Sequence, residues 1–274
     1  MSSRVLERPR QARRRTAHDI VPTAELFETG FVRNLFNQLA PNYHWHEQMA
    51  CGLTNRWRRE AVDLLPALPP ASVVIDLMSG GGEMWPALRQ RLGPAAQVHA
   101  VDFAPAMLAQ ARARQQQAAQ YARTTLHHAD ALTCPLPDEA ADALVCGFGL
   151  KTLAATDFEP LARETRRLLR PGGSFVLLEL TLPRHGWRRA AFMRYLRLVL
   201  PLIAWLSRGR AALHRYLPFY AHSFANLDAV EGAFHVAGFE QVRQVPLLLG
   251  CATALVGRKP EELVGQGLDF GVSE

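Results

Sequence analysis

Apolar and polar residues alternate along most of this chain with one of two periods, helical or extended. Apolar positions at helical spacing, such as Leu35 and Leu39, predict helices within residues 24–66, which we expect to flank the entrance to a pocket. The proline-rich stretch Leu68–Pro70 ends this pattern. The β-branched run Ser72–Leu77 that follows predicts the first strand of the core.

Beyond residue 72, predicted strands and helices alternate regularly, and residues 228–257 add a helix and two strands. This order predicts an α/β fold with a Rossmann-like, doubly wound, mainly parallel seven-stranded sheet and helices on both faces. A ligand would bind at the carboxyl ends of the parallel strands. The other predicted strands are Gln97–Val101, Leu126–Ala129, Asp142–Cys146 and Ser174–Leu180, the helices Pro105–Ala122 and Phe158–Leu169, and the turns Pro171–Gly173 and Ala237–Phe239.

One segment, at about residues 185–222, interrupts the regular order. Its apolar part, Ala191–Leu206, contains Arg194 and Arg197 and is broken by Pro201. The uncharged portion is therefore shorter than the roughly 20 apolar residues that a membrane-spanning helix needs. Two interpretations remain open, a lid or interfacial helix beside the substrate and a helix packed on the core.

The charge is positive and is carried almost entirely by arginine. The formal net charge is +6, and Lys151 and Lys259 are the only lysines. Nucleic acid, an anionic membrane or a phosphorylated acceptor would suit this charge. No recognition motif accompanies it, and the arginine and alanine content fits biased base composition, so we predict no nucleic-acid partner.

The ends of the chain differ from its middle. Residues 1–23 contain six arginines within the first sixteen positions and no apolar stretch, which predicts a disordered basic tail rather than a secretory signal. An organelle transit segment is the alternative. Residues 24–260 are expected to form a single domain and residues 261–274 a loose tail.

Four scattered cysteines without a C-x-x-C pair indicate neither disulfides nor zinc, and the two histidine pairs, at 44 and 46 and at 127 and 128, lack a third metal ligand. We therefore predict no metal and a cytoplasmic protein. Peripheral membrane contact and a homodimer stay open.

The most informative motif runs from Val73 to Glu83, where a hydrophobic strand leads through Asp76 into a glycine-rich turn with Ser79, Gly80 and Gly82. Glycines let the backbone approach a ligand closely. A dinucleotide site would require a third glycine where Trp85 stands, so the turn favours S-adenosylmethionine (SAM). Trp85 either faces the sulfonium of SAM or packs beside the turn.

Acidic residues end the next two predicted strands. Asp102, followed by Phe103, can accept hydrogen bonds from both ribose hydroxyls of a nucleoside. Asp130 can accept from an adenine amino group while the amide of Ala131 meets the ring, although a helix-capping role for Asp130 is the alternative. At the end of the fourth strand, Gly147 leaves room for the methionine part of SAM.

Together these residues resemble the UbiE-type family of ubiquinone and menaquinone C-methyltransferases, over roughly residues 30–257. The resemblance implies a class I methyltransferase fold, with SAM contacts at Trp85, Asp102, Asp130, Ala131 and Gly147. It also implies C-methylation of a small, largely apolar acceptor of the aromatic, quinol or isoprenoid kind. The matching pieces beyond the glycine turn are Phe36-x-x-x-Ala40-x-x-Tyr43, Trp57-Arg58-Arg59, Phe148-Gly149-Leu150, Leu168–Gly173, Arg215-Tyr216-Leu217 and Ala237-Gly238-Phe239.

The departures from the family pattern all concern the acceptor side. The residues after Tyr43 are His44-Trp45-His46-Glu47 instead of the family's aspartate and later asparagine. Lys151-Thr152 replaces an Arg-Asn pair, and Pro218–Ser223 replaces a Ser-Ile-x-x-x-Pro stretch.

Methylation of carbon requires an in-line approach to the methyl group and removal of a proton. His44, His46 and Glu47 are the candidate bases, with surface or capping roles as the alternative for each histidine, and Lys151 is a cation that could stabilise a phenolate. Tyr43 could orient the acceptor by hydrogen bonding. Further acceptor contacts are expected at Trp57, Tyr216, Tyr220 and His222.

Two other functions stay open on the sequence. One is O- or N-methylation of a specialised metabolite or lipid headgroup, which requires no proton from carbon. The other is a non-catalytic partner subunit with the methyltransferase fold, although the intact series Asp76, Asp102 and Asp130 argues against it.

Overall fold

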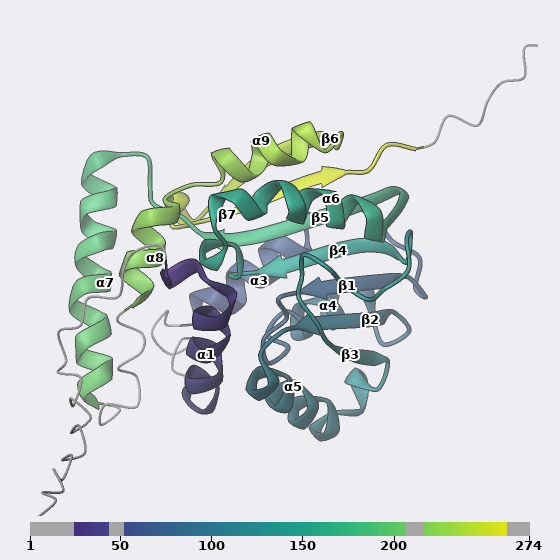
Figure 1. The fold of residues 1–274 in the computed structure, drawn as a ribbon, viewed down its shortest axis with the longest axis horizontal. Coiled ribbons are helices and arrows are strands. Elements are labelled where there is room, and N and C mark those ends of the chain that lie inside the picture. The colour runs from purple at the N-terminus through teal and green to yellow at the C-terminus, as the bar shows by residue number, and fades with distance from the viewer. Residues whose placement is uncertain (1–24, 44–51, 207–215, 262–274) are drawn as a thin grey trace, which may run out of the picture.

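A computed structural model describes residues 25–43, 52–206 and 216–261 of the chain (Figure 1). Its centre is a seven-stranded sheet in the order β3-β2-β1-β4-β5-β7-β6, in which β7 runs antiparallel to both of its neighbours. The predicted doubly wound, mainly parallel sheet is thereby confirmed. The strands are β1 (Val73–Leu77), β2 (Gln97–Asp102), β3 (Thr124–His128), β4 (Ala141–Gly147), β5 (Leu169–Leu180), β6 (Glu240–Leu247) and β7 (Ala252–Arg258).

Helices cover both faces of the sheet, so the central strands are buried on both sides and consist of nearly continuous apolar runs. Successive side chains of a strand point to opposite faces of the sheet. In β1, Val74 packs towards α3 and α4, and Ile75 packs towards α6 and α9. The helices around the sheet are α3 (Leu53–Val62), α4 (Trp85–Leu92), α5 (Pro105–Gln117), α6 (Phe158–Leu168) and α9 (Asp228–Val236).

Two element boundaries differ by five residues from the sequence prediction, and the others differ by at most two. The predicted turn Pro171–Gly173 lies within β5, because Leu169 already pairs with Ala141 of β4 while Ser174 pairs with Ala143. The residues between them form a bulge. The helix predicted to reach residue 122 ends at Gln117, and a 3-10 turn, η3 (Ala119–Tyr121), follows it.

A helical layer stands at the carboxyl ends of the parallel strands (Figure 1). Its aromatic contacts join α8 to α1 and include Tyr220 against Leu35 and Leu39. The long helix α7 lies beside α8 at one end of the molecule, and within the described residues no helix is long and apolar enough to cross a membrane. The layer comprises η1 (Glu25–Phe27), α1 (Thr29–Leu39), η2 (Ala40–Asn42), α7 (Gly186–Leu206) and α8 (Leu217–Phe224).

Candidate cofactor and acceptor site

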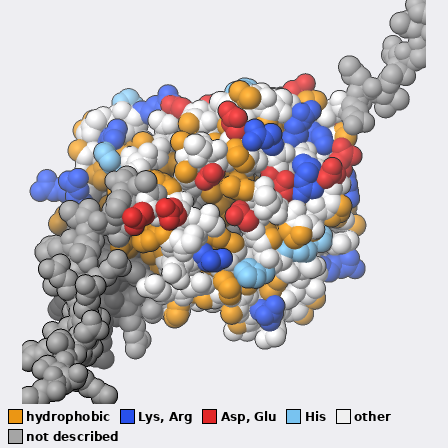
Figure 2. Space-filling view, in the orientation of Figure 1, with side chains coloured by type: hydrophobic (Ala, Val, Ile, Leu, Met, Phe, Trp, Pro, Cys, Tyr) orange, Lys and Arg blue, Asp and Glu red, His pale blue; other side chains and the backbone are white. Residues whose placement is uncertain are grey.

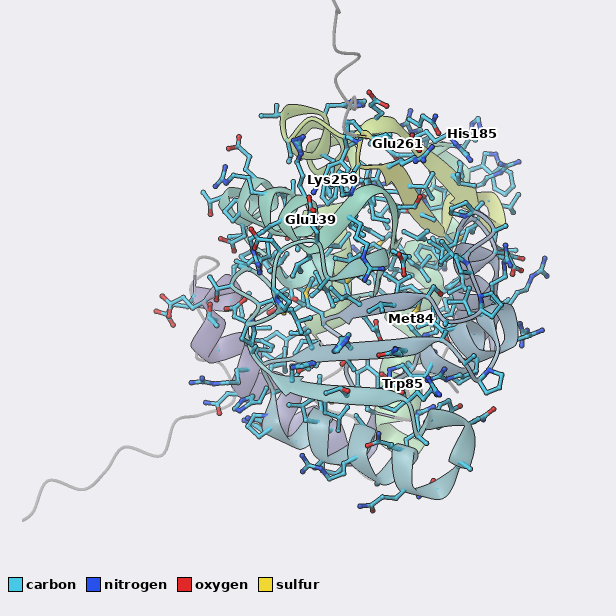
Figure 3. The ribbon with its side chains drawn as sticks, turned by 90° about the vertical axis from the view of Figure 1, so that its right-hand side faces the viewer. Met84, Trp85, Glu139, His185, Lys259 and Glu261 are labelled. Carbon is cyan, nitrogen blue, oxygen red and sulfur yellow. The ribbon has the colours of Figure 1, made fainter. Side chains whose placement is uncertain are left out.

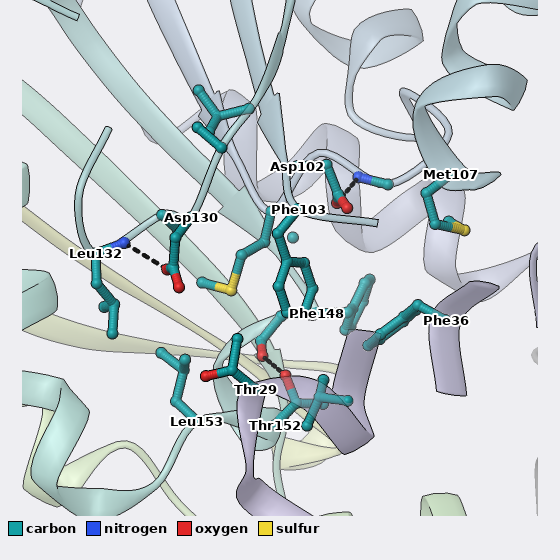
Figure 4. A pocket seen from close by; sticks show the side chains of 18 of the residues that line it. Thr29, Phe36, Asp102, Phe103, Met107, Asp130, Leu132, Phe148, Thr152 and Leu153 are labelled. Atoms are coloured by element: carbon teal, nitrogen blue, oxygen red, sulfur yellow. Dashed lines mark hydrogen bonds between the residues drawn. The ribbon is translucent and has the colours of Figure 1, made fainter. Parts of the chain in front are cut away.

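A cavity opens between the carboxyl ends of the strands and the helix α1 (Figure 4). Together with the solvent-open space at its mouth, it has a volume of about 800 Å³. Polar groups from the ends of β2 and β3 lie in one part of its wall, and aromatic and aliphatic side chains line most of the rest. The lining residues are Phe27, Thr29, Val32, Phe36, Tyr43, Met78, Gly80, Glu83, Val101, Asp102, Phe103, Met107, Ala129, Asp130, Ala131, Leu132, Gly147, Phe148, Gly149, Thr152, Leu153 and Asp157.

The glycine-rich turn after β1 brings backbone into this wall. The amide of Gly80 donates a hydrogen bond of 2.8 Å to Asp102 Oδ2, and the amide of Gly81 donates one of 2.9 Å to Glu83 Oε2. Gly80 has a positive φ of 57°, and a Cβ there would lie 2.7 Å from Glu83 Oε2. A larger residue would therefore strain the backbone and push the Glu83 carboxylate out of place.

Asp102 is held at the edge of the cavity by two backbone donors. Figure 4 shows the bond from the amide of Gly80, and the second oxygen, Oδ1, accepts a bond of 2.8 Å from the amide of Ala104. Burial raises the pKa of this carboxyl to about 6, although these backbone bonds act in the opposite direction. A carboxylate has about four acceptor positions, so two remain for donors in the cavity. This is the arrangement that a ribose diol would need.

Asp130 offers a similar acceptor one strand further along. Its Oδ1 accepts a 2.9 Å bond from the amide of Leu132, which closes a short turn after β3 (Figure 4). No α-helix begins at this turn in the structure, so the bond belongs to a turn rather than to a helix cap. Ala131 and Leu132 line the cavity beside it.

Four predicted cofactor contacts lie behind this wall rather than in it. Asp76 is fully buried, and its pKa is raised well above the usual range first by burial and then by the charges of Glu83 and Asp102. Ser79 is buried, and its amide donates to the carbonyl of Val101. Asp76, Ser79, Gly82 and Trp85 are all absent from the lining.

Trp85, labelled in Figure 3, is the first residue of α4 and packs into the core. It is fully buried, and the centroid of its ring lies 5.5 Å from that of Tyr121, which belongs to the same core cluster. A Cβ at Gly82 would lie only 2.6 Å from the indole, so this glycine is required by packing. Of the two interpretations of Trp85, the structure favours packing over contact with the sulfonium.

The other side of the cavity is aromatic. Phe36 of α1 and Tyr43 lie with ring centroids 6.5 Å apart, and both line the cavity with Phe148 (Figure 4). The pKa of the Tyr43 phenol is raised far above its usual value, mainly by burial and then by the charge of Glu83. Tyr43 therefore stays neutral and can act as a hydrogen-bond donor at any physiological pH.

Phe148 follows Gly147 at the end of β4 and has a positive φ of 64°. Its ring lies 6.4 Å from the ring of Trp57, and the cations of Arg58 and Lys151 stand 5.5 and 5.8 Å from its centroid. These neighbours hold the ring in the cavity wall. Trp57 thus supports the wall from behind and does not itself line the cavity.

Lys151 does not line the cavity either. Its ammonium lies 3.1 Å from Glu179 Oε1 and also donates to the carbonyl of Phe148. Glu179 is fully buried and accepts further bonds from the amides of Lys151 and Leu180. The charge of Lys151 is thus engaged by a buried carboxylate, and the predicted role of stabilising a phenolate would require the pair to open.

The predicted acceptor contacts on α8 and directly before it also lie outside the lining. The hydroxyl of Tyr220 donates a 2.6 Å bond to the carbonyl of Leu26, and the ring of Tyr216 packs edge-on against Phe31. Both tyrosines therefore hold α1, the helix that forms one wall of the cavity. His222 is exposed. The candidate bases His44, His46 and Glu47 lie outside the described residues.

Several lining residues were not among the site residues predicted from the sequence. Thr29, Val32 and Phe36 follow the three- and four-residue spacing of one helix face, which would have been enough to group them. Met107 and Asp157 come from segments whose local sequence gives no indication of a site. Among the described residues, no group of three or more His, Cys, Asp or Glu side chains could hold a metal ion.

The cavity fits SAM. Asp102 and Asp130 present spare acceptors for hydroxyl and amino donors, Gly80 and Gly147 leave room for a ligand against backbone, and the aromatic rings suit a sulfonium cation. The seven-stranded sheet with its single antiparallel strand is the fold of the class I methyltransferases. Together with the cavity and the matching family model, it makes this chain a SAM-dependent methyltransferase.

Within that class, the chain belongs to the ubiE/COQ5 methyltransferase family, whose model matches residues 24–259. It is 36% identical to the demethylmenaquinone methyltransferase of Thermus thermophilus over 82% of this chain and 100% of the relative. It is 32% identical to the demethylmenaquinone methyltransferase of Deinococcus radiodurans over 89% of this chain and 99% of that protein. The resemblance drawn from the sequence is confirmed.

Solved structures with lower sequence identity share the fold. A phosphoethanolamine N-methyltransferase of Haemonchus contortus in complex with SAM superposes with a TM-score of 0.55 at 16% identity, over 74% of this chain and 52% of that one. A protein of Methanococcus maripaludis assigned to the SAM-dependent methyltransferases gives a TM-score of 0.59 at 18% identity, over 84% and 95% of the two chains.

Proposed function

We propose that this enzyme transfers the methyl group of SAM to a ring carbon of a quinol that carries an apolar chain. The observation that carries the proposal is the full-length similarity to demethylmenaquinone methyltransferases. The cavity supports it, because an aromatic wall faces the carboxylates that suit the nucleoside of SAM. A flat quinol ring fits between such a wall and the bound cofactor.

The cofactor side is assigned to residues at the ends of β1, β2, β3 and β4. Asp102 would accept hydrogen bonds from the ribose hydroxyls, and Asp130 would accept one from the adenine amino group. The amide of Ala131 and the ring of Phe103 would flank the adenine, while Gly80 and Gly147 would let the methionine part approach the backbone. Ser79, Gly82 and Trp85 would act by holding the turn in shape.

SAM supplies an activated methyl group on a sulfonium. A new bond forms between this carbon and the ring, the carbon–sulfur bond breaks, and the bonding electrons leave with S-adenosylhomocysteine. The ring carbon then loses its proton, and the quinol becomes aromatic again. Phe36, Phe148 and Val32 would keep the acceptor in line and exclude water, and Tyr43 would donate a hydrogen bond to a quinol oxygen.

The proton acceptor stays a prediction. His44, His46 and Glu47 follow Tyr43 directly in the chain and are the nearest candidates by sequence. His44→Ala and His46→Ala variants are expected to lose turnover while they still bind SAM. Full activity of both variants would favour methylation of oxygen or nitrogen, where no carbon-bound proton has to be removed.

The test is an anaerobic methylation assay with a demethylmenaquinol that has a short side chain. NMR then locates the transferred methyl group on the product. The matched control is the corresponding menaquinol, whose ring carbon already carries a methyl group. We expect methylation of the first compound at carbon and no reaction of the second. Equal methylation of both compounds would locate the new methyl group on oxygen and contradict the proposal.

The comparisons do not favour the other functions considered. The N-methyltransferase among the structural neighbours is only 16% identical and shows the fold alone. A non-catalytic partner subunit is not favoured by a chain that aligns with the whole length of methyltransferases. The acceptor is a small molecule, and its apolar chain would place it in a membrane, so peripheral membrane contact is part of the proposal. Nothing in the described residues supports a homodimer.

A further inference from the structure

Helix α7 carries an apolar stripe on its exposed side. Trp187 and Leu198 are 70% and 65% exposed, and Ala191 and Tyr195 lie between them at intervals of four, four and three residues. These intervals place all four side chains on one side of the helix. The opposite side packs inward on the protein core through Leu196, Phe192 and Met193.

Arginines border this stripe. Arg194 and Arg197 are exposed on one flank, and Arg188 lies on the other with its guanidinium 5.2 Å from the Trp187 ring. Within the described part of the chain, no salt bridge joins any of these three arginines to an acidic side chain. Arg194 and Arg197 are exposed, so they suit an anionic partner.

The net positive charge of the protein comes from the sequence segment that contains this helix. Between Glu179 and Asp228 the sequence contains eight arginines and no aspartate or glutamate. The remainder of the chain has 23 basic and 25 acidic residues, so without this segment the net positive charge disappears. Figure 2 shows Lys and Arg side chains projecting at the edge of the molecule where α7 lies in Figure 1.

We propose that this face of α7 docks on an anionic lipid bilayer, with the helix lying in the plane of the headgroups. Tryptophan and tyrosine favour the interface between headgroups and acyl chains, and arginine can extend its charge to lipid phosphates while its stem stays in the apolar layer. The helix is not apolar enough to span the bilayer. An amphipathic helix with a basic border is the form that binds such a surface.

Charge argues against a second copy of this chain as the occupant. A symmetric dimer through this face would bring Arg194 and Arg197 of both copies together, with no acidic residue of α7 to compensate them. An anionic bilayer is complementary to the same arrangement. The bilayer is therefore the occupant that the charges favour.

Docking of α7 on a bilayer would place the cavity near the membrane. α7 lies beside α8, and α8 packs through Tyr220 and Phe219 on α1, which forms one wall of the cavity. Docking would bring this wall close to the headgroups, where a quinol with an apolar chain could enter. Only this last step rests on the proposed function, because docking itself needs neither cofactor nor acceptor.

The test is co-sedimentation of the full-length protein with phosphatidylcholine vesicles, with and without phosphatidylglycerol, in the absence of SAM and acceptor. We expect binding to the anionic vesicles that weakens with rising salt, and much weaker binding to the neutral ones. Each arginine near the surface contributes about a fivefold gain, so Arg194→Gln with Arg197→Gln should weaken binding about 25-fold. Trp187→Ser with Leu198→Ser should weaken it about tenfold or more.

Matched controls remove the same side chains elsewhere on the surface. Arg112→Gln with Arg123→Gln removes two exposed arginines at the other end of the sheet, and Leu249→Ser removes a leucine that is 63% exposed. Both controls should bind vesicles like the wild type. All variants should also methylate a short-chain, water-soluble quinol at the wild-type rate, which separates failure of docking from failure of the proposed function.

Three results would overturn the proposal. The first is equal binding of the wild type to neutral and anionic vesicles. The second is undiminished binding by both α7 variants, which would locate membrane contact on another part of the chain. The third is a wild-type dimer in light scattering that Trp187→Ser with Leu198→Ser converts to a monomer, which would make this face an interface between copies.

Discussion

Burial of Asp102 raises the pKa of its carboxyl, so cofactor binding should depend on whether this group is ionised. Its pKa is raised to about 6 because the carboxyl is buried, and the charged form is the one that can accept two further hydrogen bonds from ribose hydroxyls. The affinity for SAM is therefore expected to be constant above about pH 6 and to fall up to about tenfold per pH unit below it. Calorimetric titration between pH 5 and pH 8 measures this directly.

The raised pKa of Asp102 also makes the stability of the fold depend on pH. Stability should fall as the pH rises, whereas the affinity for SAM should rise, so the two measurements control each other. A carboxyl whose pKa is higher in the folded state stabilises the protein below the unfolded value of 3.8, and this contribution is lost as the pH rises through about 6. It amounts to about 3 kcal/mol. Asp102→Asn should remove both pH dependences, and a wild-type SAM affinity that is flat down to pH 5 would contradict the assignment.

Lys151 and Glu179 form a buried ion pair, so removal of the cation should destabilise the fold. Lys151→Met would leave a fully buried carboxylate without its partner, at a cost of about 3–5 kcal/mol. Lys151→Arg, which restores the residue type of the family, should cost much less. Urea unfolding measures the free energy of each variant.

The control for that comparison is an exposed ion pair. Arg163 and Glu159 are both more than half exposed on α6, so Arg163→Met should change stability by less than about 1 kcal/mol. If Lys151→Met were equally mild, the pair would contribute little to the fold, and a direct role of Lys151 at the acceptor would become more attractive.

The positions of residues at the cavity were predictable where the pattern is local and not where the partner is distant. Asp102 ends β2 and Asp130 follows shortly after β3, and both could be assigned to the cavity because strand ends meet at one edge of the sheet. The partner of Lys151 lies 28 residues away on the next strand, and no local pattern indicates it. Trp85 was ambiguous because the sequence does not show which side of the turn its ring occupies.

At the scale of elements, the wall of the cavity depends on how α1 is attached to α8. The hydroxyl of Tyr220 donates to the buried carbonyl of Leu26, directly before α1. Loss of this bond in Tyr220→Phe leaves the carbonyl without its partner, at a local cost of about 1–3 kcal/mol. We expect the KM for the acceptor to rise about five- to tenfold, since about 1.4 kcal/mol corresponds to a factor of ten.

The affinity for SAM should change less than about twofold in this variant, because the carboxylates assigned to SAM lie at the ends of β2 and β3. Tyr121→Phe is a matched control, since Tyr121 is buried against Trp85, away from the helical layer. Steady-state kinetics with varied acceptor and varied SAM separate the two effects. A variant that loses SAM affinity and acceptor affinity equally would show that α1 belongs to the cofactor site as well.

The existence of the elements was predictable, but their ends were less so. The run Val73–Leu77 is apolar at every position except Asp76, as expected for a strand buried on both faces. The start of β5 was predicted five residues late, because Pro171–Gly173 have the composition of a turn and their place in a bulge depends on pairing with β4. Such pairing is a tertiary effect that local propensity does not contain.

On the scale of the whole molecule, the cavity is built from segments that are far apart in the chain. Phe27 and Phe36 come from its beginning, Asp102 and Asp130 from its middle, and Thr152 and Asp157 from the loop after β4. A ligand that contacts these segments together stabilises the domain as one unit. The prediction of a single domain over residues 24–260 therefore leads to a measurable consequence for thermal unfolding.

SAM at a hundredfold excess over its Kd should stabilise the protein by about 2.7 kcal/mol. For a domain of this size that corresponds to a rise in Tm of about 5–10 °C. Differential scanning calorimetry should show one cooperative transition that shifts as a whole, whereas Asp102→Ala should show the same transition with no shift. Two separate transitions, of which only one responds to SAM, would mean that the segments around the cavity do not unfold together, and the prediction of a single domain would then be wrong.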